Sequence, residues 1–431
     1  MSISVVILAA GKGSRMKSTT PKVLHEISGK AMLFHAIDAA QKISDDITIV
    51  LYHQASRIQE SVEKDYKNIN FHIQDVEQFP GTGGAMRDIT TKYEKTLILN
   101  GDMPLITQNS LLALTSGDAD INMSVIKLDN PSGYGRVIIK NEKVQEIVEE
   151  KDCNKIQKET KTVNAGIYCV DSTLLNRYIP MIDNHNAQKE YYLTDIVKMA
   201  VDEDLMVTPI FVEEEEFKGV NSKLDLAKAE EIMQNRIKEE LMMAGVIMRL
   251  PDTIYIDCRA KFKGECIVEN GVTILGESYL ENAHIKSHSV IEDAKVINSD
   301  VGPMGRLRPL ADIRDTHIGN FVEIKKSTLT GVKAGHLAYI GDSTIGEGSN
   351  IGAGVITCNY DGKNKYKTVI GKNVFVGSDT QLVAPVTIED DVIIAAGTTL
   401  TKNVKQGSLA ISRPPLKIMA EFFYRFFGKS R

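Results

Sequence analysis

The sequence predicts an α/β protein in three parts: an N-terminal Rossmann-like domain, a long linker helix and a C-terminal parallel β-helix. Up to about residue 223, apolar strand candidates alternate with amphipathic helical stretches. From about residue 252 onward, short aliphatic positions recur every six residues instead. A chain of 431 residues is also long for a single hydrophobic core. We therefore expect domains at 1–223 and 246–431, with the linker helix at 224–245 between them.

The N-terminal domain is expected to consist of βαβ units around a parallel sheet. Its strand candidates are apolar runs, and its helix candidates place their apolar residues on one helical face. The predicted strands are 4–10, 47–52 and 96–102, and the predicted helices are 31–43 and 55–66. Ligands of such sheets bind at the carboxyl ends of the strands. The candidate binding segments are therefore LAAGKGSR (8–15) and NGDMPLI (100–106).

The loop over residues 8–22 combines two glycines with several basic side chains. It is not a P-loop, because a single lysine separates Gly11 from Gly13, and it lacks the third glycine of the dinucleotide fingerprint. It does offer backbone that a ligand can approach closely, and Arg15 and Lys22 can neutralise phosphate. We interpret it as a phosphate-binding loop. An exposed turn with solvated cations is the alternative interpretation.

Residues 224–244 predict one continuous helix. The segment contains no glycine or proline, it spaces Leu and Ile at helical intervals, and Gly245 follows it as a helix terminator. We expect this helix to act as an arm that connects the two domains.

The C-terminal part predicts a parallel β-helix. A six-residue step with an aliphatic residue and small neighbours is the repeat of this fold, in which three steps make one triangular coil. An antiparallel sandwich would need strands spaced about 8 to 12 residues apart with hairpin turns, and that spacing is absent. The polar segment NYDGKNKYK (359–367) interrupts the repeat. Insertions of this kind gather on the binding face of a solenoid.

Composition excludes several classes of function. The net charge of −6 provides no general basic surface for nucleic acid. No run approaches the roughly 18 apolar residues of a membrane span, and the N-terminus lacks the basic region of a signal peptide. Five cysteines without zinc-type spacing suit a reducing compartment. We expect a cytoplasmic protein that binds neither nucleic acid nor a membrane.

The closing segment, residues 417–431, contains four phenylalanines, one tyrosine and four cations. We expect a C-terminal helix that docks its aromatic side chains on the β-helix. An amphipathic membrane contact is the alternative, which the short length of the segment makes less favourable.

Several motifs, taken together, resemble one family. Those of the N-terminal half are LAAGKGSRMKSTTPKVLHEISGK, PGTGGAM, NGDMPLI, GYGRVI, IVEEKD, VNAGIY and KGVNSKL. Those of the C-terminal half are RLRPLADIRDTHIGNFVEIKKS, KAGH, NYDG and AISRPP. The chain resembles the bacterial bifunctional N-acetylglucosamine-1-phosphate uridylyltransferases/glucosamine-1-phosphate acetyltransferases over nearly its whole length. The resemblance implies a nucleotidyltransferase domain followed by a left-handed β-helix of hexapeptide repeats.

The resemblance implies two reactions in series. Acetyl transfer from acetyl-CoA to glucosamine-1-phosphate comes first, and uridylyl transfer from UTP to N-acetylglucosamine-1-phosphate then releases pyrophosphate. The alternative is a sugar-1-phosphate nucleotidylyltransferase whose β-helix is only an oligomerisation scaffold. A set that includes KAGH and NYDG argues for the bifunctional enzyme, because a scaffold needs no catalytic residues.

The implied uridylyltransferase site binds phosphates, uridine, sugar and magnesium. Arg15 and Lys22 are implied to be catalytic cations, and Asp102 and Asn221 to bind Mg²⁺. The implied nucleotide and sugar positions are Leu8, Ala9, Ala10, Gly11, Lys22, Gln74, Gly81, Thr82, Gly135, Glu149 and Asn164. Gln78 competes with Gln74, and Glu150 competes with Glu149. One carboxylate and one amide oxygen suit Mg²⁺, which usually keeps waters and substrate phosphates as its other ligands.

The implied acetyltransferase site centres on His336, because histidine is best suited to remove a proton near neutral pH. A structural corner histidine is the alternative. The implied sugar-phosphate positions are Arg308, Lys325, Tyr339, Asn350 and Lys365, and those for acetyl-CoA are Ala353, Asn359, Tyr360, Ser378, Ala396 and Arg413. Arg306 competes with Arg308. The resemblance also implies a homotrimer, in which three β-helices pack side by side.

Overall fold

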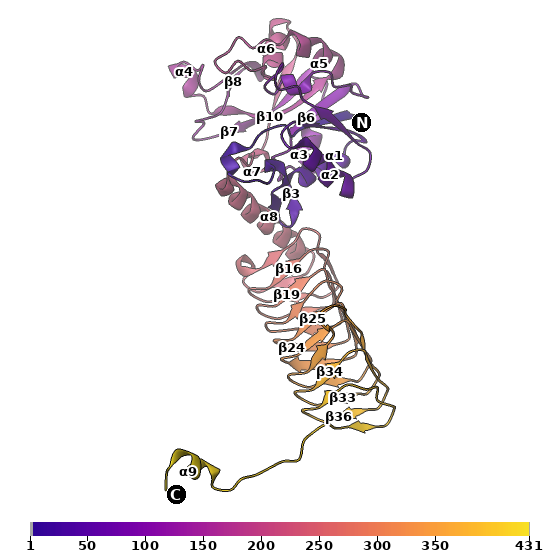
Figure 1. Ribbon diagram of the computed structural model, residues 1–431. Helices are drawn as coiled ribbons and strands as arrows, with labels where there is room; N and C mark the ends of the chain where they lie inside the picture. The colour runs from indigo at the N-terminus through magenta and orange to yellow at the C-terminus, as the bar shows by residue number, and fades with distance from the viewer. Residues whose placement is uncertain (1–2, 431) are drawn as a thin grey trace. The chain divides into compact units, whose positions relative to one another are not determined.

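The computed structural model describes residues 3–430 (Figure 1). The chain divides into two compact units, residues 1–234 and 235–431. The helix predicted over 224–244 forms as α8 (Lys223–Met243). The division falls inside α8, so each unit includes part of this helix.

The first unit is built on a nine-stranded sheet, whose main path runs in the order β11-β7-β10-β6-β1-β4-β5. Its strands are β1 (Ile3–Leu8), β4 (Asp46–Leu51), β5 (Ile69–Ile73), β6 (Lys95–Asn100), β7 (Ile121–Lys127), β8 (Arg136–Lys140), β9 (Lys143–Val148), β10 (Thr162–Asp171) and β11 (Val207–Phe211). Its helices are α1 (Met32–Gln41), α2 (Ala55–Asp65), α3 (Gln108–Thr115), α4 (Lys155–Lys158), α5 (Ser172–Tyr178), α6 (Asp195–Asp202) and α7 (Glu214–Phe217). A small hairpin, β2 (Glu26–Ile27) with β3 (Lys30–Ala31), forms a separate two-stranded sheet.

The sheet is mixed, with the predicted parallel strands joined by an antiparallel one. Strands β1, β4, β5 and β6 are parallel, as predicted, but β10 pairs antiparallel with both β6 and β7. After β7 the chain forms the β8–β9 hairpin and the short helix α4, and then re-enters the sheet in the opposite direction. Between β7 and β10, all within the described residues, no long crossover helix returns the chain to the same end of the sheet, so an antiparallel pairing results.

The central strands are buried on both faces. In β1, Val5 and Ile7 belong to the core on one face, and Val6 belongs to the core on the other. Burying each such side chain stabilises the fold by about 1.5–3 kcal/mol. Two covered faces leave the edge at the strand ends as the place for polar side chains. Leu8 and Asn100, the last residues of β1 and β6, are register partners at that edge.

The helix α8 ends as its sequence predicts. Gly245 has φ of +102°, a conformation that glycine adopts without strain. The Gly245 N–H donates to Met242 O, and the Val246 N–H donates to Leu241 O, each at 3.0 Å. These two bonds form a Schellman motif, which satisfies carbonyls that would otherwise lack partners.

The second unit is a β-helix of three parallel sheets, as predicted (Figure 1). The first sheet contains β12 (Ile247–Met248), β15 (Ile267–Val268), β18 (His284–Ile285), β21 (Asp300–Val301), β24 (His317–Asn320), β27 (Lys333–His336), β30 (Asn350–Ile351), β33 (Phe375–Val376), β36 (Ile393–Ile394) and β38 (Leu409–Ala410). The second contains β13 (Tyr255–Ile256), β16 (Thr273–Leu275), β19 (Val290–Glu292), β22 (Arg306–Leu307), β25 (Glu323–Lys325), β28 (Tyr339–Gly341), β31 (Ile356–Cys358), β34 (Gln381–Val383) and β37 (Thr399–Leu400). The third contains β14 (Lys261–Lys263), β17 (Tyr279–Glu281), β20 (Lys295–Ile297), β23 (Asp312–Arg314), β26 (Thr328–Thr330), β29 (Ser343–Ile345), β32 (Thr368–Ile370) and β35 (Val386–Ile388).

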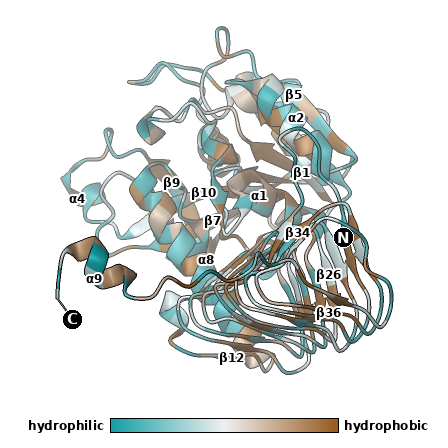
Figure 2. Ribbon diagram, turned by 60° about the horizontal axis from the view of Figure 1, so that its bottom comes forward, coloured by the Kyte–Doolittle hydropathy of each residue, from teal (hydrophilic) through white to brown (hydrophobic). Residues whose placement is uncertain are grey.

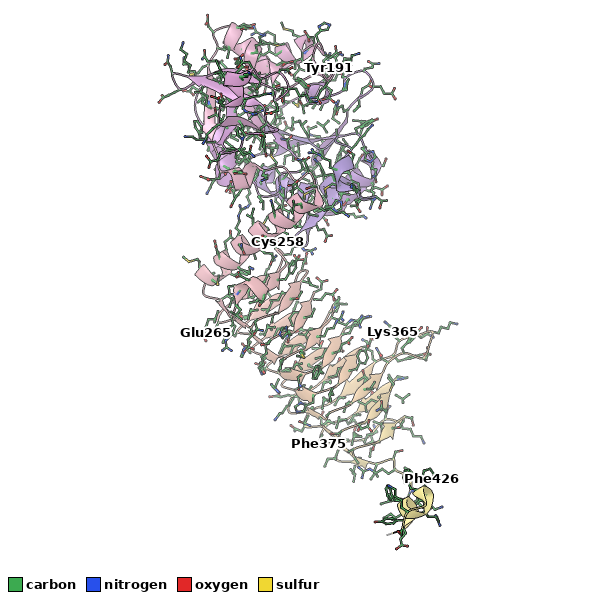
Figure 3. The ribbon with its side chains drawn as sticks, turned by 90° about the vertical axis from the view of Figure 1, so that its left-hand side faces the viewer. Tyr191, Cys258, Glu265, Lys365, Phe375 and Phe426 are labelled. Atoms are coloured by element: carbon green, nitrogen blue, oxygen red, sulfur yellow. The ribbon has the colours of Figure 1, made fainter. Side chains whose placement is uncertain are left out.

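The aliphatic residues of the six-residue repeat form the β-helix core. Ile291, Leu307, Ile324 and Ile340 are register partners in successive coils of the second sheet, and all four are fully buried. The coil sequence therefore folds as its periodicity predicts, since each inward residue stacks on the one below. The segment 359–367 leaves the coil as a loop, on which Lys365 is labelled in Figure 3.

The closing segment does not dock on the β-helix, so that prediction is wrong. Residues 411–430 are exposed, and Phe426 in α9 (Phe422–Phe427) is 69% exposed. The hydropathy colouring of Figure 2 shows α9 as largely hydrophobic. Its rings instead contact one another, as Phe423 and Phe427 do with centroids 4.9 Å apart. In the described residues, no helix has the length and apolar character to cross a membrane.

Candidate active sites

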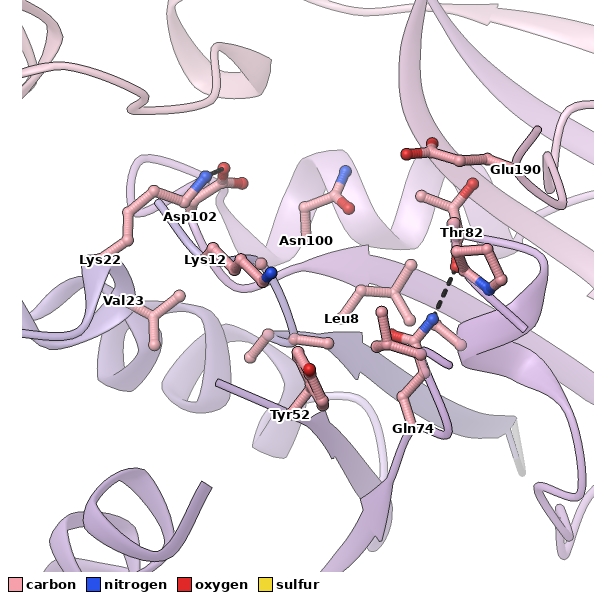
Figure 4. A pocket seen from close by; sticks show the side chains of 17 residues that line it. Leu8, Lys12, Lys22, Val23, Tyr52, Gln74, Thr82, Asn100, Asp102 and Glu190 are labelled. Atoms are coloured by element: carbon pink, nitrogen blue, oxygen red, sulfur yellow. Dashed lines mark hydrogen bonds and ion pairs between the residues drawn. The ribbon is translucent and has the colours of Figure 1, made fainter. Parts of the chain in front are cut away.

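A cavity of about 520 Å³ lies at the carboxyl ends of β1 and β6 (Figure 4). Predicted site residues account for nine of the residues that line it: Leu8, Ala9, Ala10, Gly11, Lys22, Gln74, Gly81, Thr82 and Asp102. The cavity thus brings the predicted phosphate-binding loop and the NGD segment together, although Lys22 and Asp102 are far apart in sequence.

The loop after β1 shapes one wall of this cavity. Gly13 has φ of +60°, and a Cβ added there would lie 2.6 Å from the Cβ of Lys22. A larger residue would displace the lysine, so glycine allows the Lys22 side chain to pass close to the loop. Gly11 faces open space, where a ligand could approach its backbone.

The Lys22 ammonium group lies between two predicted magnesium ligands. It forms an ion pair with Asp102, and it donates to Asn221 Oδ1 at 3.1 Å. Arg15 donates to the same oxygen at 2.9 Å. The side chains of Lys22 and Asp102 are only 13% and 16% exposed, so their attraction is weakly screened by solvent. The arrangement shows that the Asp102 and Asn221 oxygens converge on one cation-sized position.

Gln74, and not Gln78, lines the cavity. Gln74 is 5% exposed, and its amide group donates to the carbonyls of Phe79 and Gly81 at 3.0 and 2.9 Å. Gln78 is exposed on the loop that follows β5. The bonds of Gln74 hold its amide against the turn that contains Gly81 (Figure 4).

The predicted sugar-binding residues form a separate group. A Cβ at Gly135 would lie 3.4 Å from Glu149 Oε1, and the Asn164 N–H donates to Gly135 O at 2.9 Å. Burial raises the pKa of Glu149, with a smaller contribution from the Asp152 carboxylate. Glu150 instead forms a 2.6 Å ion pair with the buried Arg136. The structure therefore places Glu149, rather than Glu150, against Gly135.

Asn100 links this group to the cavity. Its side chain lines the cavity and donates to Gly166 O at 3.1 Å, and the Gly166 N–H donates to Asn164 Oδ1 at 2.9 Å. The sequence interpretation missed Asn100 as a site residue, although it directly precedes the Gly-Asp pair. It also missed Lys12, Tyr52 and Glu190, which line the cavity as well.

Glu190 carried no sequence signal, because tertiary packing brings it to the site. The main chain of Tyr191 bonds to both sides of the Gly81 turn: its N–H donates to Pro80 O, and its carbonyl accepts from Gly83 N–H, each at 2.8 Å. The Leu193 N–H donates to Thr82 Oγ1 at 3.1 Å. These bonds attach the loop before α6 to the cavity wall.

In the second unit, His336 stands in a column with three predicted acetyl-CoA residues. The register of the first sheet aligns Ala334 with Ile351, Ile351 with Val376 and Val376 with Ile394, and the residue two positions after each continues the same alignment. His336, Ala353, Ser378 and Ala396 consequently occupy equivalent positions in successive coils. Arg413 extends this column, since its guanidinium donates to Ala396 O at 2.9 Å. The His336 side chain is exposed, and its Nδ1 lies 3.0 Å from Asn320 Oδ1.

Two predicted phosphate cations, Arg308 and Lys325, belong to the second-sheet side of the coil, and Lys365 approaches them from the inserted loop. The proximity of Lys365, and secondarily of Arg308, lowers the pKa of Lys325. Arg308 also donates to Glu323 at 2.8 Å, an ion pair that the sequence interpretation did not foresee. The three cations repel one another, and an anionic ligand bound among them would relieve that repulsion. Arg308, and not its competitor Arg306, belongs to this cluster.

Gly341 allows two of the predicted groups to meet. A Cβ there would lie 2.7 Å from both Tyr339 Oη and Asn359 Nδ2, so a larger residue would displace these side chains. Asn359 is buried and donates to Asp342 at 2.6 Å. Tyr339 of the predicted sugar-phosphate set and Asn359 of the predicted acetyl-CoA set therefore both lie beside Gly341.

The remaining predicted residues lie nearby in the fold. Tyr360 and Lys365 pair across the inserted loop, and the Tyr360 hydroxyl donates to Gly362 O. Asn350 lies on β30 in register with Lys333 and Phe375.

Comparison with known proteins identifies both halves. Residues 5–159 match the MobA-like NTP transferase domain, and residues 367–402 match the bacterial transferase hexapeptide (six repeats). The bifunctional protein GlmU of a Sulfurovum species is 74% identical over 428 residues, which cover 99% of this chain and 100% of that protein. The bifunctional protein GlmU of a Nitratiruptor species is 60% identical over 430 residues, which cover 100% of each chain.

A solved structure also aligns with part of the chain. The inositol-1-phosphate CTP transferase from T. maritima is 16% identical, with a TM-score of 0.44, and covers 53% of this chain and 94% of its own. The full-length relatives carry the identification, because their identity extends across both units. The chain belongs to the GlmU family of bifunctional enzymes and is a transferase with uridylyltransferase and acetyltransferase activities.

Proposed function

We propose that each unit carries one of the two reactions with the residues assembled above. The second unit would transfer the acetyl group of acetyl-CoA to glucosamine-1-phosphate. The first unit would then join N-acetylglucosamine-1-phosphate to UTP and release pyrophosphate. The observation that carries this proposal is the clustering of each predicted set within its own unit.

Uridylyl transfer brings two anions together, so neutralisation of phosphate charge is its main requirement. Lys22 and Arg15 supply positive charge beside the loop of Leu8 to Gly11. Gln74 holds its N–H groups on main-chain carbonyls, which leaves its amide oxygen to accept from the imide N–H of uracil. Gly135, Glu149 and Asn164 would hold the acetylated sugar.

Asp102 and Asn221 fit a magnesium ion. Their oxygens are hard donors, and the Lys22 ammonium group already lies between them as a stand-in cation. In the described part of the chain, no cluster of three or more His, Cys, Asp or Glu offers a metal site made entirely of such side chains. A magnesium ion bound here would neutralise phosphate charge, with the substrates supplying its other ligands.

In acetyl transfer, His336 would accept a proton from the sugar amine as its nitrogen attacks the thioester carbon. The carbon–sulfur bond then breaks, and the CoA thiolate takes up a proton as it leaves. The pantetheine arm of acetyl-CoA would lie along the small residues Ala353, Ser378 and Ala396. Arg308, Lys325 and Lys365 would bind the phosphate of the acceptor, for which a guanidinium is well suited.

We propose a homotrimer, because the β-helix exposes large apolar side chains. These are Phe321 at 52%, Leu337 at 60%, Phe375 at 52%, Ile393 at 51% and Leu409 at 63% exposure. Exposed apolar groups of this size favour association. Sedimentation of the purified protein tests this proposal: an active monomer would refute it.

We also propose a cytoplasmic location. None of the five cysteines, all within the described residues, forms a disulfide, which suits a reducing compartment.

Mass spectrometry of one reaction tests the proposed function. The protein is incubated with glucosamine-1-phosphate, acetyl-CoA, UTP and Mg²⁺, and each component is omitted in turn. UDP-N-acetylglucosamine should form only in the complete mixture. Omitting Mg²⁺ in the presence of EDTA should stop the reaction at N-acetylglucosamine-1-phosphate. Product that forms only from added N-acetylglucosamine-1-phosphate would instead make the β-helix a scaffold.

A further inference from the structure

Asn320 and His336 form a pair across two neighbouring coils of the β-helix. They are register partners at the ends of β24 and β27, in the first sheet. The Leu337 N–H donates to Asn320 O at 3.1 Å, and the histidine Nδ1 lies 3.0 Å from Asn320 Oδ1. Asn320 thus contacts the His336 region through both its main chain and its side chain.

The backbone around this pair is repeated from coil to coil. The residue after each partner, Phe321 or Leu337, is left-handed, with φ of +58° and +48°. Such conformations are costly for residues other than glycine, so the surrounding ladder must hold them in place. The Cα positions of Asn320 and His336 are therefore set by the coil, and the side-chain bond then orients the ring.

The chemistry of the bond selects one form of the neutral imidazole. An amide oxygen only accepts hydrogen bonds, so the proton of the ring must lie on Nδ1. The lone pair is then on Nε2, the atom that points away from this bond. A general base needs this free lone pair, and the bond supplies it without introducing a charge.

We infer that Asn320 is a positioning residue for acetyl transfer, which orients His336 and keeps its Nε2 unprotonated and available. This inference rests on the proposed role of His336 as the general base. Charged groups on the flanking strands are few: β24 carries His317, whose ring bonds to Asp300, and β27 carries Lys333. The strand on the other side, β30, consists of Asn350 and Ile351 and contributes no charge.

Three variants test the inference in the full-length enzyme. Asn320→Ala removes the acceptor and should lower kcat for acetyl transfer about 10- to 100-fold, the range for lost orienting partners, with both KM values nearly unchanged. Asn320→Asp keeps the acceptor and adds a negative charge, which should raise the pKa of the imidazolium. In the pH profile of acetyl transfer by this variant, the fall in rate at low pH should therefore begin about one pH unit higher, with near-normal kcat above that pH. Asn282→Asp introduces the same charge at another asparagine of the β-helix, away from the site, and should leave the profile unchanged.

The outcomes separate this inference from the function beneath it. If His336→Ala retains acetyl transfer, the proposed base is wrong, and the role of Asn320 is refuted with it. If His336→Ala is inactive but Asn320→Ala matches the parent enzyme, only the role of Asn320 is refuted. If Asn320→Ala fails to fold, as judged by circular dichroism, the pH profile of Asn320→Asp decides alone. An unshifted profile overturns the inference.

Discussion

The two sites differ in how the chain assembles them. The site of the first unit is a cavity whose lining residues, from Leu8 to Glu190, come from strand ends and loops with no common spacing. The site of the second unit is an exposed column, in which His336, Ala353 and Ser378 occupy equivalent positions in successive coils. A mixed sheet thus gathers unrelated segments at one edge, whereas a solenoid places related positions above one another. The residues of the second site can therefore be located from the sequence repeat, whereas those of the first can be located only once the order of the strands is known.

The sites also differ in charge. In the first, Lys22 pairs with Asp102, and Arg15 bonds to the neighbouring Asn221. In the second, Arg308 and Lys365 crowd Lys325 and lower its pKa. The first arrangement suits a metal ion together with phosphates, and the second suits one phosphate group.

The largest expected effect follows from His336→Ala. Removing the proposed general base should reduce acetyl transfer by about 10²- to 10⁴-fold, with uridylyl transfer unchanged. Separate assays with glucosamine-1-phosphate and with N-acetylglucosamine-1-phosphate measure the two activities. His317→Ala, one coil below, is the matched control and should retain both. Loss of both activities in His336→Ala would show that the two sites are not independent.

Asp102→Asn should have the reverse selectivity. It removes the only charged member of the proposed magnesium pair, and uridylyl transfer should fall about 10²- to 10³-fold, as when one group that stabilises developing charge is lost. Acetyl transfer should be unaffected. Titration with Mn²⁺, followed by electron paramagnetic resonance, should show weaker binding to the variant. Unchanged Mn²⁺ affinity would contradict the assignment of Asp102.

A matched pair of core substitutions compares the stability of the units. Ile324→Ala in β25 and Ile7→Ala in β1 each remove a fully buried side chain from a central parallel strand. Each should lower the free energy of unfolding by about 2–5 kcal/mol. Residual activity after heating should show earlier loss of acetyl transfer in the first variant and of uridylyl transfer in the second. Equal loss of both activities in both variants would mean that the units unfold together.

The smallest expected effect concerns pH and Asp195. Burial, reinforced by Asp183, raises the pKa of Asp195 to about 6. The folded chain then binds this proton more tightly than the unfolded chain does, so stability falls as pH rises from about 4 to 6. Asp195→Asn should stabilise the first unit by about 1 kcal/mol at pH 7.5, a value reduced for partial exposure, and by nothing near pH 4. Urea unfolding at the two pH values measures this difference.

For Glu269 in the second unit, stability should depend on pH in the opposite direction. Hydrogen bonds from Ser287, and then from His284, lower its pKa to about 2. Its stabilising contribution is therefore complete above about pH 4.5 and is lost as pH falls toward 2. Glu269→Gln should therefore lower the stability of the second unit, and the loss should be constant between about pH 4.5 and 7.5, where the effect of Asp195→Asn varies with pH. A gain for Asp195→Asn that is equal at pH 4 and 7.5 would contradict the proposed cause.

The sequence predicted most of the β-helix but less of the first unit. The inward residues, such as Ile324, follow directly from the six-residue period. The direction of β10 could not be predicted from the sequence, because a buried strand has the same apolar pattern whether it runs parallel or antiparallel to its neighbours. The aromatic side chains of α9 predicted burial, but in the described residues these rings contact one another and Arg425.

The candidate sites show the same contrast. Lys22 and Asp102 could be expected to meet, since both follow strands that end at one edge of the sheet. Glu190 could not, because the packing of Tyr191 against the Gly81 turn brings it there. Asn320 was also missed, since its value depends on the histidine that stands one coil away.

The division of α8 sets a rule for anyone who wishes to separate or recombine the halves of this enzyme. The Glu230 carboxylate near the start of the helix accepts from the main chain and hydroxyl of Ser28, whereas the buried Lys238 donates to Pro251 O and Leu241 packs on the β-helix core. A fragment that stops at residue 223 loses the partner of Ser28, and one that starts at residue 246 loses the cover of its first coil. Stable fragments and chimeras should therefore each retain the whole of α8, so that the two coding segments overlap by one helix.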